Sequence, residues 1–392
     1  MSRVRVVHLS VVHTPDDPRI YERECRALSQ AGHQVAYLAP GARRHRDDWG
    51  VLVAPLPRRS RKTRFLDTVE IARALRDLRP HVLHVHDPEL LTLFPAVKAF
   101  VPRLVYDMHE YLPEQVAAKP YIPERVRPLA SRTTAVAQLA LATLADGVVV
   151  VVPDQLDALG EIPRLRLVLP NYPRVERFEG AEPLPDLAGD PRLKLMYVGS
   201  LSRNRGCSLM LDVMERLQAH EAVLYLGGVF AAADLEAEVQ ARLAAGLADR
   251  VKLLGRVPPA DLPRYLAAAD VVWVPSLEST QYAHPTVPTK LLEGMAMARC
   301  ALVSNLPGRG ELVRLEQCGL AVPPTVDGHC SGVRRLLGNR SEIAEMGARG
   351  RRAVERQYSW EAVEGDLVDF YDSLCAGLPR DGAPRPPRSD RP

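Results

Sequence analysis

Residues 284–305 read HPTVPTKLLEGMAMARCALVSN, which we interpret as a loop, a short helix and then a buried strand. Pro288 opens the helix, where its missing N–H costs no intrahelical hydrogen bond. Lys290 and Glu293 are three residues apart, so a helix places them on one face near its positive N-terminal end. Such a helix start suits a phosphate group, and a nearby carboxylate can accept hydrogen bonds from sugar hydroxyls. The alternative is an ordinary solvated Lys–Glu pair, and the spacing alone does not distinguish the two.

Length and composition indicate a two-domain α/β protein. A chain of 392 residues exceeds what one hydrophobic core usually holds. The net charge of only +3 gives no bulk field that would favour nucleic acid as a partner. The six cysteines are scattered, without a CxxC pair or a zinc-site spacing. With no recognisable signal peptide and no apolar run long enough to cross a bilayer, the sequence predicts a reducing, cytoplasmic setting.

Short apolar strands alternate with helices through the first half of the chain, which is typical of a parallel sheet covered on both faces. We expect strands at residues 4–12, 34–39, 51–55, 82–86, 103–106, 148–152 and 167–169. We expect helices at residues 20–31, 63–78, 89–100 and 124–145.

The alternation then stops and begins again. Residues 173–192 are rich in Pro, Gly and acidic residues and lack periodicity, which indicates a linker. Expected strands follow at residues 194–198, 223–227, 251–254, 271–274 and 301–304. Expected helices follow at 207–219, 231–245, 259–268, 289–296, 341–357 and 360–374.

This pattern predicts two Rossmann-like, doubly wound domains. The predicted boundaries are 1–175 for the first domain, 176–192 for a linker, 193–357 for the second domain, 358–376 for a C-terminal helix and 377–392 for a disordered Pro- and Arg-rich tail. Ligands of such sheets bind beyond the carboxyl ends of the strands. Polar residues that directly follow a strand are therefore the candidates for a site.

In the second half, the loop GSLSRNRG (Gly199–Gly206) follows a strand. Its glycines let the backbone approach a ligand closely, and Arg203 and Arg205 bring positive charge. Gly227 and Gly255 take corresponding places after the next two strands. The loop matches neither the GxGxxG nor the GxxxxGK[ST] pattern, and the alternative is a solvated arginine turn.

In the first half, four polar residues directly follow strands: Asp87, Asp107, His109 and Glu110. For His109 the alternative is a buried histidine with satisfied hydrogen bonds. His84 and His86 alternate within one strand and face one side, so we expect them to be packed or hydrogen-bonded rather than metal ligands. No metal cluster is visible in the spacing.

Taken in order, several motifs resemble the retaining nucleotide-sugar glycosyltransferases of family 4, which have the GT-B fold. The matching segments are HTPDDPRIYERECRALSQAGHQV (13–35), HVHDPELL (84–91), VYDMHEYLPE (105–114), VLPNYP (168–173), YVGSLSRNRG (197–206), PTKLLEGMAMARCALVSN (288–305) and YSWEAVEGDLVDFY (358–371). Each segment is weak alone, whereas the ordered set is specific. The resemblance covers about the first 375 residues.

The resemblance implies two Rossmann-like domains facing across a cleft, with the final helix crossing back to the first domain. It implies that Arg203 and Arg205 hold the donor diphosphate, that Lys290 lies near the same phosphates, and that His109 faces the transferred sugar. Glu293 matches the second glutamate of the family's E-x7-E motif, which bonds the donor ribose. The implied donor site comprises Gly199, Arg203, Arg205, Gly227, Gly255, Pro288, Thr289, Lys290 and Glu293. The implied catalytic residues are His109, Glu110, Arg203 and Lys290, and the implied acceptor-side residues are Asp16, Arg19, Asp87 and Asp107.

The sequence departs from the family pattern in two places. Pro285 stands where the first glutamate of the motif is expected, as in a similar sub-branch with P-x-K-x-x-E, and this leaves the identity of the sugar open. The loop after the first strand lacks the family's Gly-Gly pair and carries Asp16, Asp17 and Arg19 instead. This leaves open how the acceptor binds.

The implied reaction moves a sugar from a UDP- or GDP-sugar to an acceptor hydroxyl with retention, in polysaccharide, glycolipid or glycosylated-metabolite biosynthesis. No cofactor or metal is expected, because cationic side chains can stabilise the leaving phosphate. The acceptor is left open between a glycan, a lipid-linked sugar and a small molecule. The alternatives are a nucleotide-sugar epimerase of the same fold and a catalytically idle nucleotide-sugar-binding protein.

A basic run in the first half suggests one further partner. It comprises Arg43, Arg44, Arg46, Arg58, Arg59, Arg61, Lys62 and Arg64. Our hypothesis is a peripheral contact with the inner face of the membrane, near a lipid-linked acceptor. The sequence alone favours the alternative, a solvated basic loop.

Overall fold

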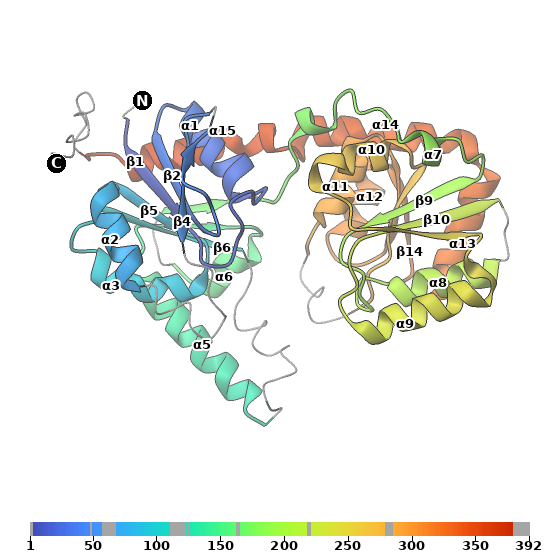
Figure 1. Cartoon of the computed structure of the whole chain (residues 1–392), viewed down its shortest axis with the longest axis horizontal. Helices are drawn as coiled ribbons and strands as arrows, with labels where there is room; N and C mark the ends of the chain where they lie inside the picture. The colour runs from blue at the N-terminus through green and yellow to red at the C-terminus, as the bar shows by residue number, and fades with distance from the viewer. Residues whose placement is uncertain are drawn as a thin grey trace. The chain divides into compact units, whose positions relative to one another are not determined.

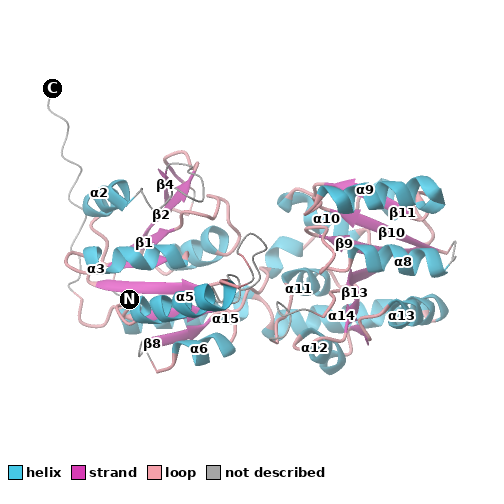
Figure 2. Ribbon diagram, turned by 90° about the horizontal axis from the view of Figure 1, so that it is seen from below, coloured by secondary structure: helices cyan, strands magenta, loops and turns pink. Residues whose placement is uncertain are grey.

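The computed structural model describes residues 3–47, 49–56, 68–109, 123, 125–161, 165–217, 221–278 and 285–378. The chain forms two compact α/β units (Figure 1). It passes from the first unit to the second between Asn171 and Tyr172, and it returns to the first between Ala362 and Val363. Helices lie on both sides of each sheet (Figure 2), as the alternation of strands and helices predicts.

The described part of the first unit holds an eight-stranded sheet in the order β3-β4-β2-β1-β5-β6-β7-β8. Its strands are β1 (Arg5–Leu9), β2 (Gln34–Pro40), β3 (His45–Arg46), β4 (Leu52–Leu56), β5 (Val82–Val85), β6 (Arg103–Met108), β7 (Gly147–Val150) and β8 (Leu165–Val168). The pairs are parallel except that β3 runs antiparallel to β4 at the edge. The central strand β5 is buried at every position, because helices cover both of its faces.

The helices of the first unit follow the predicted order with shorter bounds. They are a π-helical stretch Ile20–Cys25 that continues into α1 (Arg26–Gln30), α2 (Thr68–Leu78), a 3-10 turn Pro88–Leu93 that continues into α3 (Phe94–Val97), α5 (Arg127–Ala142), α6 (Asp154–Leu159) and α15 (Trp360–Leu374). The helix expected at 89–100 is therefore divided into a 3-10 turn and a short α-helix. Pro95 supplies no backbone N–H and restricts the residue before it, which disfavours one continuous α-helix. Residues 63–67 of another expected helix lie outside the described residues.

The described part of the second unit holds a parallel six-stranded sheet in the order β11-β10-β9-β12-β13-β14. Its strands are β9 (Leu193–Val198), β10 (Ala222–Gly227), β11 (Val251–Gly255), β12 (Val271–Val274), β13 (Cys300–Ser304) and β14 (Gly319–Val322). β14 has no counterpart among the expected strands. It lies at the edge with only Leu320 fully buried, so its apolar pattern is weak.

Two core layers cover the two faces of the second sheet. The helices are α7 (Pro185–Ala188), α8 (Cys207–Leu217), α9 (Ala233–Arg242) continuing as a π-helical stretch Leu243–Leu247, α10 (Leu262–Ala267), α11 (Thr289–Ala296), α12 (Arg309–Glu316), α13 (Val326–Gly338) and α14 (Arg340–Gln357), with 3-10 turns at Val175–Phe178 and Pro259–Asp261. One layer packs α8, α9 and α13, and the other packs α10, α11, α12 and α14. α11 has the predicted bounds, whereas α12 and α13 have no counterpart among the expected helices.

The stretch predicted as a linker at 176–192 belongs to the second unit. Val175 and Phe178 are buried in the same core layer as α11 and α14. Two apolar side chains are therefore enough to fix a segment whose composition indicates a linker. Part of the predicted disordered tail, residues 379–392, lies outside the described residues.

The prediction that the C-terminal helix returns to the first domain is confirmed. From Val363 onward, α15 belongs to the first unit. The hydroxyl of Tyr371 lies 2.8 Å from Nδ1 of His84, and both groups are buried. Gly147 makes room for the helix, because a Cβ there would lie 2.6 Å from Cζ of Phe370. None of the described helices is both long enough and apolar enough to span a membrane.

Tyr371→Phe should lower the free energy of unfolding by about 1–3 kcal/mol, because it leaves a buried nitrogen of His84 without its partner. Urea unfolding followed by circular dichroism measures the difference. Tyr265→Phe is the control, because the Tyr265 hydroxyl has no hydrogen-bond partner among the described residues. Equal stability of the two variants would contradict the assigned bond.

Candidate functional site

Polar side chains gather where β1, β5 and β6 end, three strands that lie side by side in the first sheet. The carboxylate of Asp87, after β5, accepts hydrogen bonds from the Ser10 hydroxyl at 2.8 Å and from the Val11 amide at 2.7 Å. Asp87 thereby joins the loop after β1 to the end of β5. This is the edge where parallel sheets bind ligands.

His13 lies in the loop after β1 and was not among the expected site residues. Its Nδ1 lies 2.9 Å from a carboxylate oxygen of Asp17, and its Nε2 lies 3.8 Å from one of Asp87. Its ring meets the ring of His109 edge-on, with centroids 5.0 Å apart. Burial alone would lower the pKa of His13, but the hydrogen bond and charge of Asp17, together with the charge of Asp87, raise it. The signal in the sequence was its position directly after a strand, beside two aspartates.

A buried ion pair lies behind these side chains. Arg19 donates from Nη2 to both carboxylate oxygens of Asp107, at 3.0 and 3.1 Å, and from Nε to one of them at 3.1 Å. Burial would raise the pKa of Asp107, but the charges of Arg19 and His109 and its hydrogen bonds hold it well below the usual range. Arg19 also donates to the carbonyl of Leu169 and to the side chain of Asn171, both at 2.9 Å. Arg19 and Asp107 were predicted to lie on the acceptor side. The structure places them inside the first unit, where Arg19 is 5% exposed and Asp107 is 0% exposed.

The other first-half residues lie in different places. Asp16 is exposed, and His109 is partly exposed beside Asp107. Asp87 is buried against the loop that follows β1. Glu110 lies outside the described residues. Of the residues predicted for this half, the structure therefore brings Arg19 and His109 into contact with Asp107, and His13 links His109 to Asp87.

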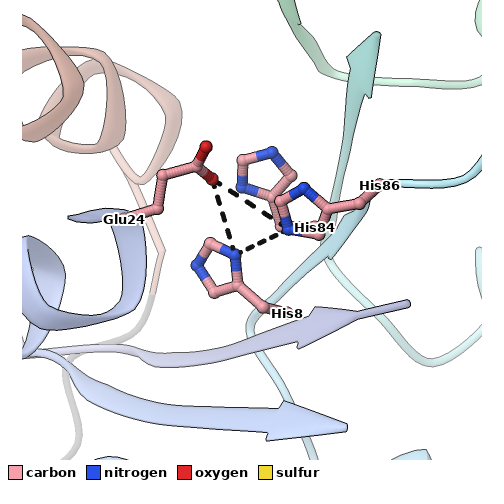
Figure 3. Close-up of side chains that lie close together, drawn as sticks. All are labelled: His8, Glu24, His84 and His86. Carbon is pink, nitrogen blue, oxygen red and sulfur yellow. Dashed lines mark hydrogen bonds and ion pairs between the residues drawn. The ribbon is translucent and has the colours of Figure 1, made fainter. Parts of the chain in front are cut away.

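Three histidines fill the space beneath this edge (Figure 3). His8 of β1 pairs in register with His84 of β5, and its Nδ1 lies 2.9 Å from Nε2 of His86. All three are fully buried, and burial lowers their pKa values, that of His86 to about 4. The prediction that His84 and His86 are hydrogen-bonded is confirmed.

Two groups of side chains in the described residues have the composition of a metal site: His8, Glu24, His84 and His86, and His86, Asp107 and His109. In the first group, the rings of His8 and His86 are nearly coplanar, with centroids 5.2 Å apart and facing nitrogens 2.9 Å apart. The two nitrogen lone pairs therefore point at each other, and two Zn–N bonds of about 2.0–2.1 Å do not fit on that line. In both groups the carboxylate also faces the positive guanidinium of Arg19. These contacts describe a hydrogen-bonded cluster rather than a coordination sphere.

In the second unit, Lys290 at the start of α11 lies against the end of β9. Its ammonium group donates to the Tyr197 hydroxyl at 2.9 Å and lies 4.2 Å from the centre of the Tyr197 ring. Gly199 leaves space for it, because a Cβ there would lie 2.9 Å from Nζ of Lys290. A side chain at Gly228, in the loop after β10, would run into the backbone of Gly199. The glycines thus bring the backbone close to the ammonium group, as the loop pattern predicts.

Positive charge accumulates around Lys290. Burial, followed by the charge of Arg205, lowers the pKa of Lys290 to about 7; Arg309 acts in the same direction and Glu293 opposes it. The side chain of Arg205 has no hydrogen-bond or ion-pair partner among the described residues. Repulsion between like charges at this edge is what a bound anion would relieve.

Arg309 is a site candidate that the sequence did not indicate. It is fully buried at the start of α12 and donates from Nη2 to the Thr286 hydroxyl at 3.3 Å. Thr286 follows Pro285, the residue in place of the missing glutamate, and forms a short bridge with Gly308. An arginine therefore donates to the side chain next to the position where the family pattern carries an acid.

The remaining residues predicted for the donor site differ in their exposure and in the groups they contact. Arg203 is half exposed and pairs with Asp234 at 3.1 Å and with Glu238, both on α9. Pro288 precedes the first residue of α11, Thr289 is exposed, and Glu293 is half-buried one turn after Lys290. Gly227 ends β10, as predicted, whereas Gly255, expected just after a strand, is the last residue of β11. Lys290 and Arg205 are thus brought together, whereas Arg203 points to α9.

Two family models match the chain. One described as "Glycosyl transferase 4-like domain" matches residues 19–171, and one described as "Glycosyl transferases group 1" matches residues 192–339. Together they cover most of both units. The chain belongs to the family 4 glycosyltransferases.

The glycosyltransferase is also similar to curated proteins over part of its length. It is 24% identical over 185 residues to the amylovoran biosynthesis glycosyltransferase AmsK of Erwinia amylovora, which is 47% of this chain and 45% of that protein. It is 33% identical over 129 residues to a GDP-mannose-dependent alpha-(1-6)-phosphatidylinositol monomannoside mannosyltransferase of Mycobacterium tuberculosis, which is 32% of this chain and 33% of that protein. The match thus spans less than half the length of each of these two relatives.

Solved structures share the whole fold at low identity. Sucrose-phosphate synthase from Thermosynechococcus elongatus superposes with a TM-score of 0.75 at 19% identity, over 95% of this chain and 100% of that one. Anabaena Alr3699/HepE in complex with UDP-glucose superposes with a TM-score of 0.70 at 16% identity, over 95% and 100%. These likenesses show that the glycosyltransferase has the GT-B fold.

Proposed function

We propose that this glycosyltransferase moves a sugar from a nucleoside-diphosphate sugar to an acceptor hydroxyl with retention of configuration. The observation that carries the proposal is the partly buried Lys290 beside Arg205 at the glycine-lined end of β9. Similar proteins support the donor class, since one relative is named as GDP-mannose-dependent and one structural neighbour is in complex with UDP-glucose.

In the proposed reaction, Lys290 and Arg205 bind the diphosphate and stabilise the charge that develops on it as the sugar leaves. Arg203 joins them by leaving Asp234 and Glu238, because exposed ion pairs are weak and a diphosphate can compete for the guanidinium. Glu293 binds the ribose and His109 faces the sugar, as in the resembling family. The departing phosphate takes the proton of the acceptor hydroxyl on the same face, so no side chain is assigned as nucleophile.

Lys290→Ala and Glu293→Ala should each lower kcat/KM by at least about 10-fold, the scale of one lost charged hydrogen bond. Turnover is measured across UDP- and GDP-sugars with added sugar, lipid-linked and small-molecule acceptors. Lys252→Ala is the matched control, because its ammonium group bonds the carbonyl of Ala248 far along the chain from the loop. An altered sugar formed without acceptor would identify an epimerase, and binding without turnover across the panel would identify an idle binding protein.

Nucleoside diphosphate binding should take up a proton above pH 7. In the ligand-free protein, Lys290 is largely neutral above pH 7 because its pKa is about 7. The charge of a bound phosphate favours the protonated form. Affinity should therefore fall by up to about tenfold per pH unit between pH 7 and 9. Calorimetry with UDP and GDP in buffers of different ionisation enthalpy measures the uptake. Lys290→Arg, which stays charged, should abolish it, and equal uptake in both proteins would exclude Lys290.

We further propose that the acceptor is presented at an anionic lipid surface, which the first unit contacts through α5. Large apolar side chains are exposed on and beside this helix: Val126 (48%), Leu129 (67%), Val136 (64%) and Leu139 (41%). Residues 125–145 include Arg125, Arg127 and Arg132 and no acidic residue. Exposed apolar side chains with interspersed positive charge suit the interface of an anionic bilayer. Arg43, Arg44 and Arg46 of the basic run are exposed as well, and the run from Arg58 to Arg64 lies outside the described residues.

The double variant Leu129→Glu, Val136→Glu should reduce co-flotation with vesicles that contain anionic phospholipid by at least about fivefold, because it removes apolar contact and adds repulsion. Leu315→Glu, at an exposed leucine of the second unit, is the control. Flotation unchanged by the double variant, or equal with neutral vesicles, would contradict the proposal.

A further inference from the structure

His109 touches two groups through the same ring nitrogen. Its Nε2 lies 3.1 Å from Oδ2 of Asp107 and 3.2 Å from Nδ1 of His86. Nδ1 of His86 in turn lies 3.4 Å from the same carboxylate oxygen. Two imidazole nitrogens and one carboxylate oxygen therefore meet at one point, and the positions of the protons follow from which groups can accept.

An ionised carboxylate can only accept hydrogen bonds. Asp107 is ionised because it pairs with Arg19 inside the first unit. Nε2 of His109 and Nδ1 of His86 must therefore both carry protons directed at Oδ2. The 3.2 Å contact between these nitrogens is then two donors sharing one acceptor, not a bond between the two rings. A neutral His109 with its proton on Nε2 has an unprotonated Nδ1.

The same logic fixes the next histidine. With its proton on Nδ1, neutral His86 has an acceptor at Nε2, and the group 2.9 Å away is Nδ1 of His8, which must be the donor. At the other end of His8, Nε2 is buried and has no hydrogen-bond partner among the described residues. Among the described residues, the series of hydrogen bonds ends there.

The carboxylate of Asp107, which sets these proton positions, also faces Arg19 and His84. Arg19 binds it through two nitrogens, and Nε of Arg19 also lies 3.1 Å from Glu24. Burial and the charge of Asp107 raise the pKa of Glu24 well above its usual value. Nε2 of His84 lies 3.9 Å from Asp107 on the remaining side.

We propose that Asp107 and His86 are positioning residues that hold His109 as the Nε2-protonated tautomer, so that its Nδ1 accepts a hydrogen bond from a hydroxyl group of the bound sugar or acceptor. The role toward a substrate rests on the proposed glycosyl transfer. The tautomer itself follows from contacts within the first unit. Neither residue needs to touch substrate, since both act through the ring of His109.

The test is the tautomer of His109 in the full-length protein. Nitrogen-15 NMR of protein labelled at histidine distinguishes the two tautomers, and His109→Gln identifies the signal. The wild type should show Nε2–H at His109 and Nδ1–H at His86 and His8. Asp107→Ala removes the common acceptor, so His109 should populate both tautomers, and kcat should fall at least about 10-fold with nucleoside diphosphate affinity unchanged.

Asp107→Asn is the conservative variant. Arg19, His86 and His109 all donate toward the Oδ2 position, so the amide should turn its oxygen there and keep the tautomer. His86→Leu gives a second test if Asp107→Ala does not fold, with a mixed tautomer and a lower kcat again expected. A merely structural role for these residues would change stability without changing the tautomer.

A wild-type His109 protonated on Nδ1 would overturn the proposal, whatever reaction the enzyme performs, because the NMR measurement needs no substrate. A tautomer that is the same in wild type, Asp107→Ala and His86→Leu would also overturn it. If His109 is Nε2-protonated but the protein transfers no sugar, the proposed function fails while the positioning by Asp107 and His86 stands.

Discussion

The buried ion pair between Arg19 and Asp107 is the interaction on which the polar edge of the first unit depends. Charges that leave water cost several kcal/mol each unless they are paired and fully hydrogen-bonded. Arg19 meets this requirement by binding Asp107 at the end of β6 and the backbone of Leu169 just after β8. One guanidinium therefore joins the loop after β1 to two other strand ends, and the histidines take their hydrogen-bonding roles from the carboxylate that it holds.

The two units arrange their charges in opposite ways. In the first unit, Arg19 and Asp107 neutralise each other. In the second unit, Lys290 and Arg205 repel each other, and burial lowers the pKa of Lys290 to about 7. Such a site is suited to an anion, because an anion would remove the repulsion and restore the proton. This is the basis on which the proposed function assigns the diphosphate to the second unit.

Much of the fold could be predicted from the sequence, because its central strands are continuous apolar runs between helix signals. The bounds of α11 agree with the prediction, since Pro288 marks its start and apolar residues repeat along one face. β14 and α12 were not predicted, because an edge strand and a half-exposed helix bury few side chains. Residues 176–192 were assigned to a linker because composition cannot show that Phe178 packs into a core formed by residues much farther along the chain.

For the site, the sequence by itself determined the candidate residues: Asp87, Asp107 and His109 near strand ends of the first unit, and Arg205 in a loop after a strand, with Lys290 and Glu293 on a helix, in the second. Position after a strand is local information, and parallel sheets bind ligands there. Only the tertiary structure decided which of these groups are buried and what they face. It placed Arg19 and Asp107 inside the first unit, turned Arg203 toward α9, and added His8, His13 and Arg309. The physical reason is that burial and charge partners depend on contacts between residues far apart in the chain, and these contacts decide protonation and hydrogen-bonding direction.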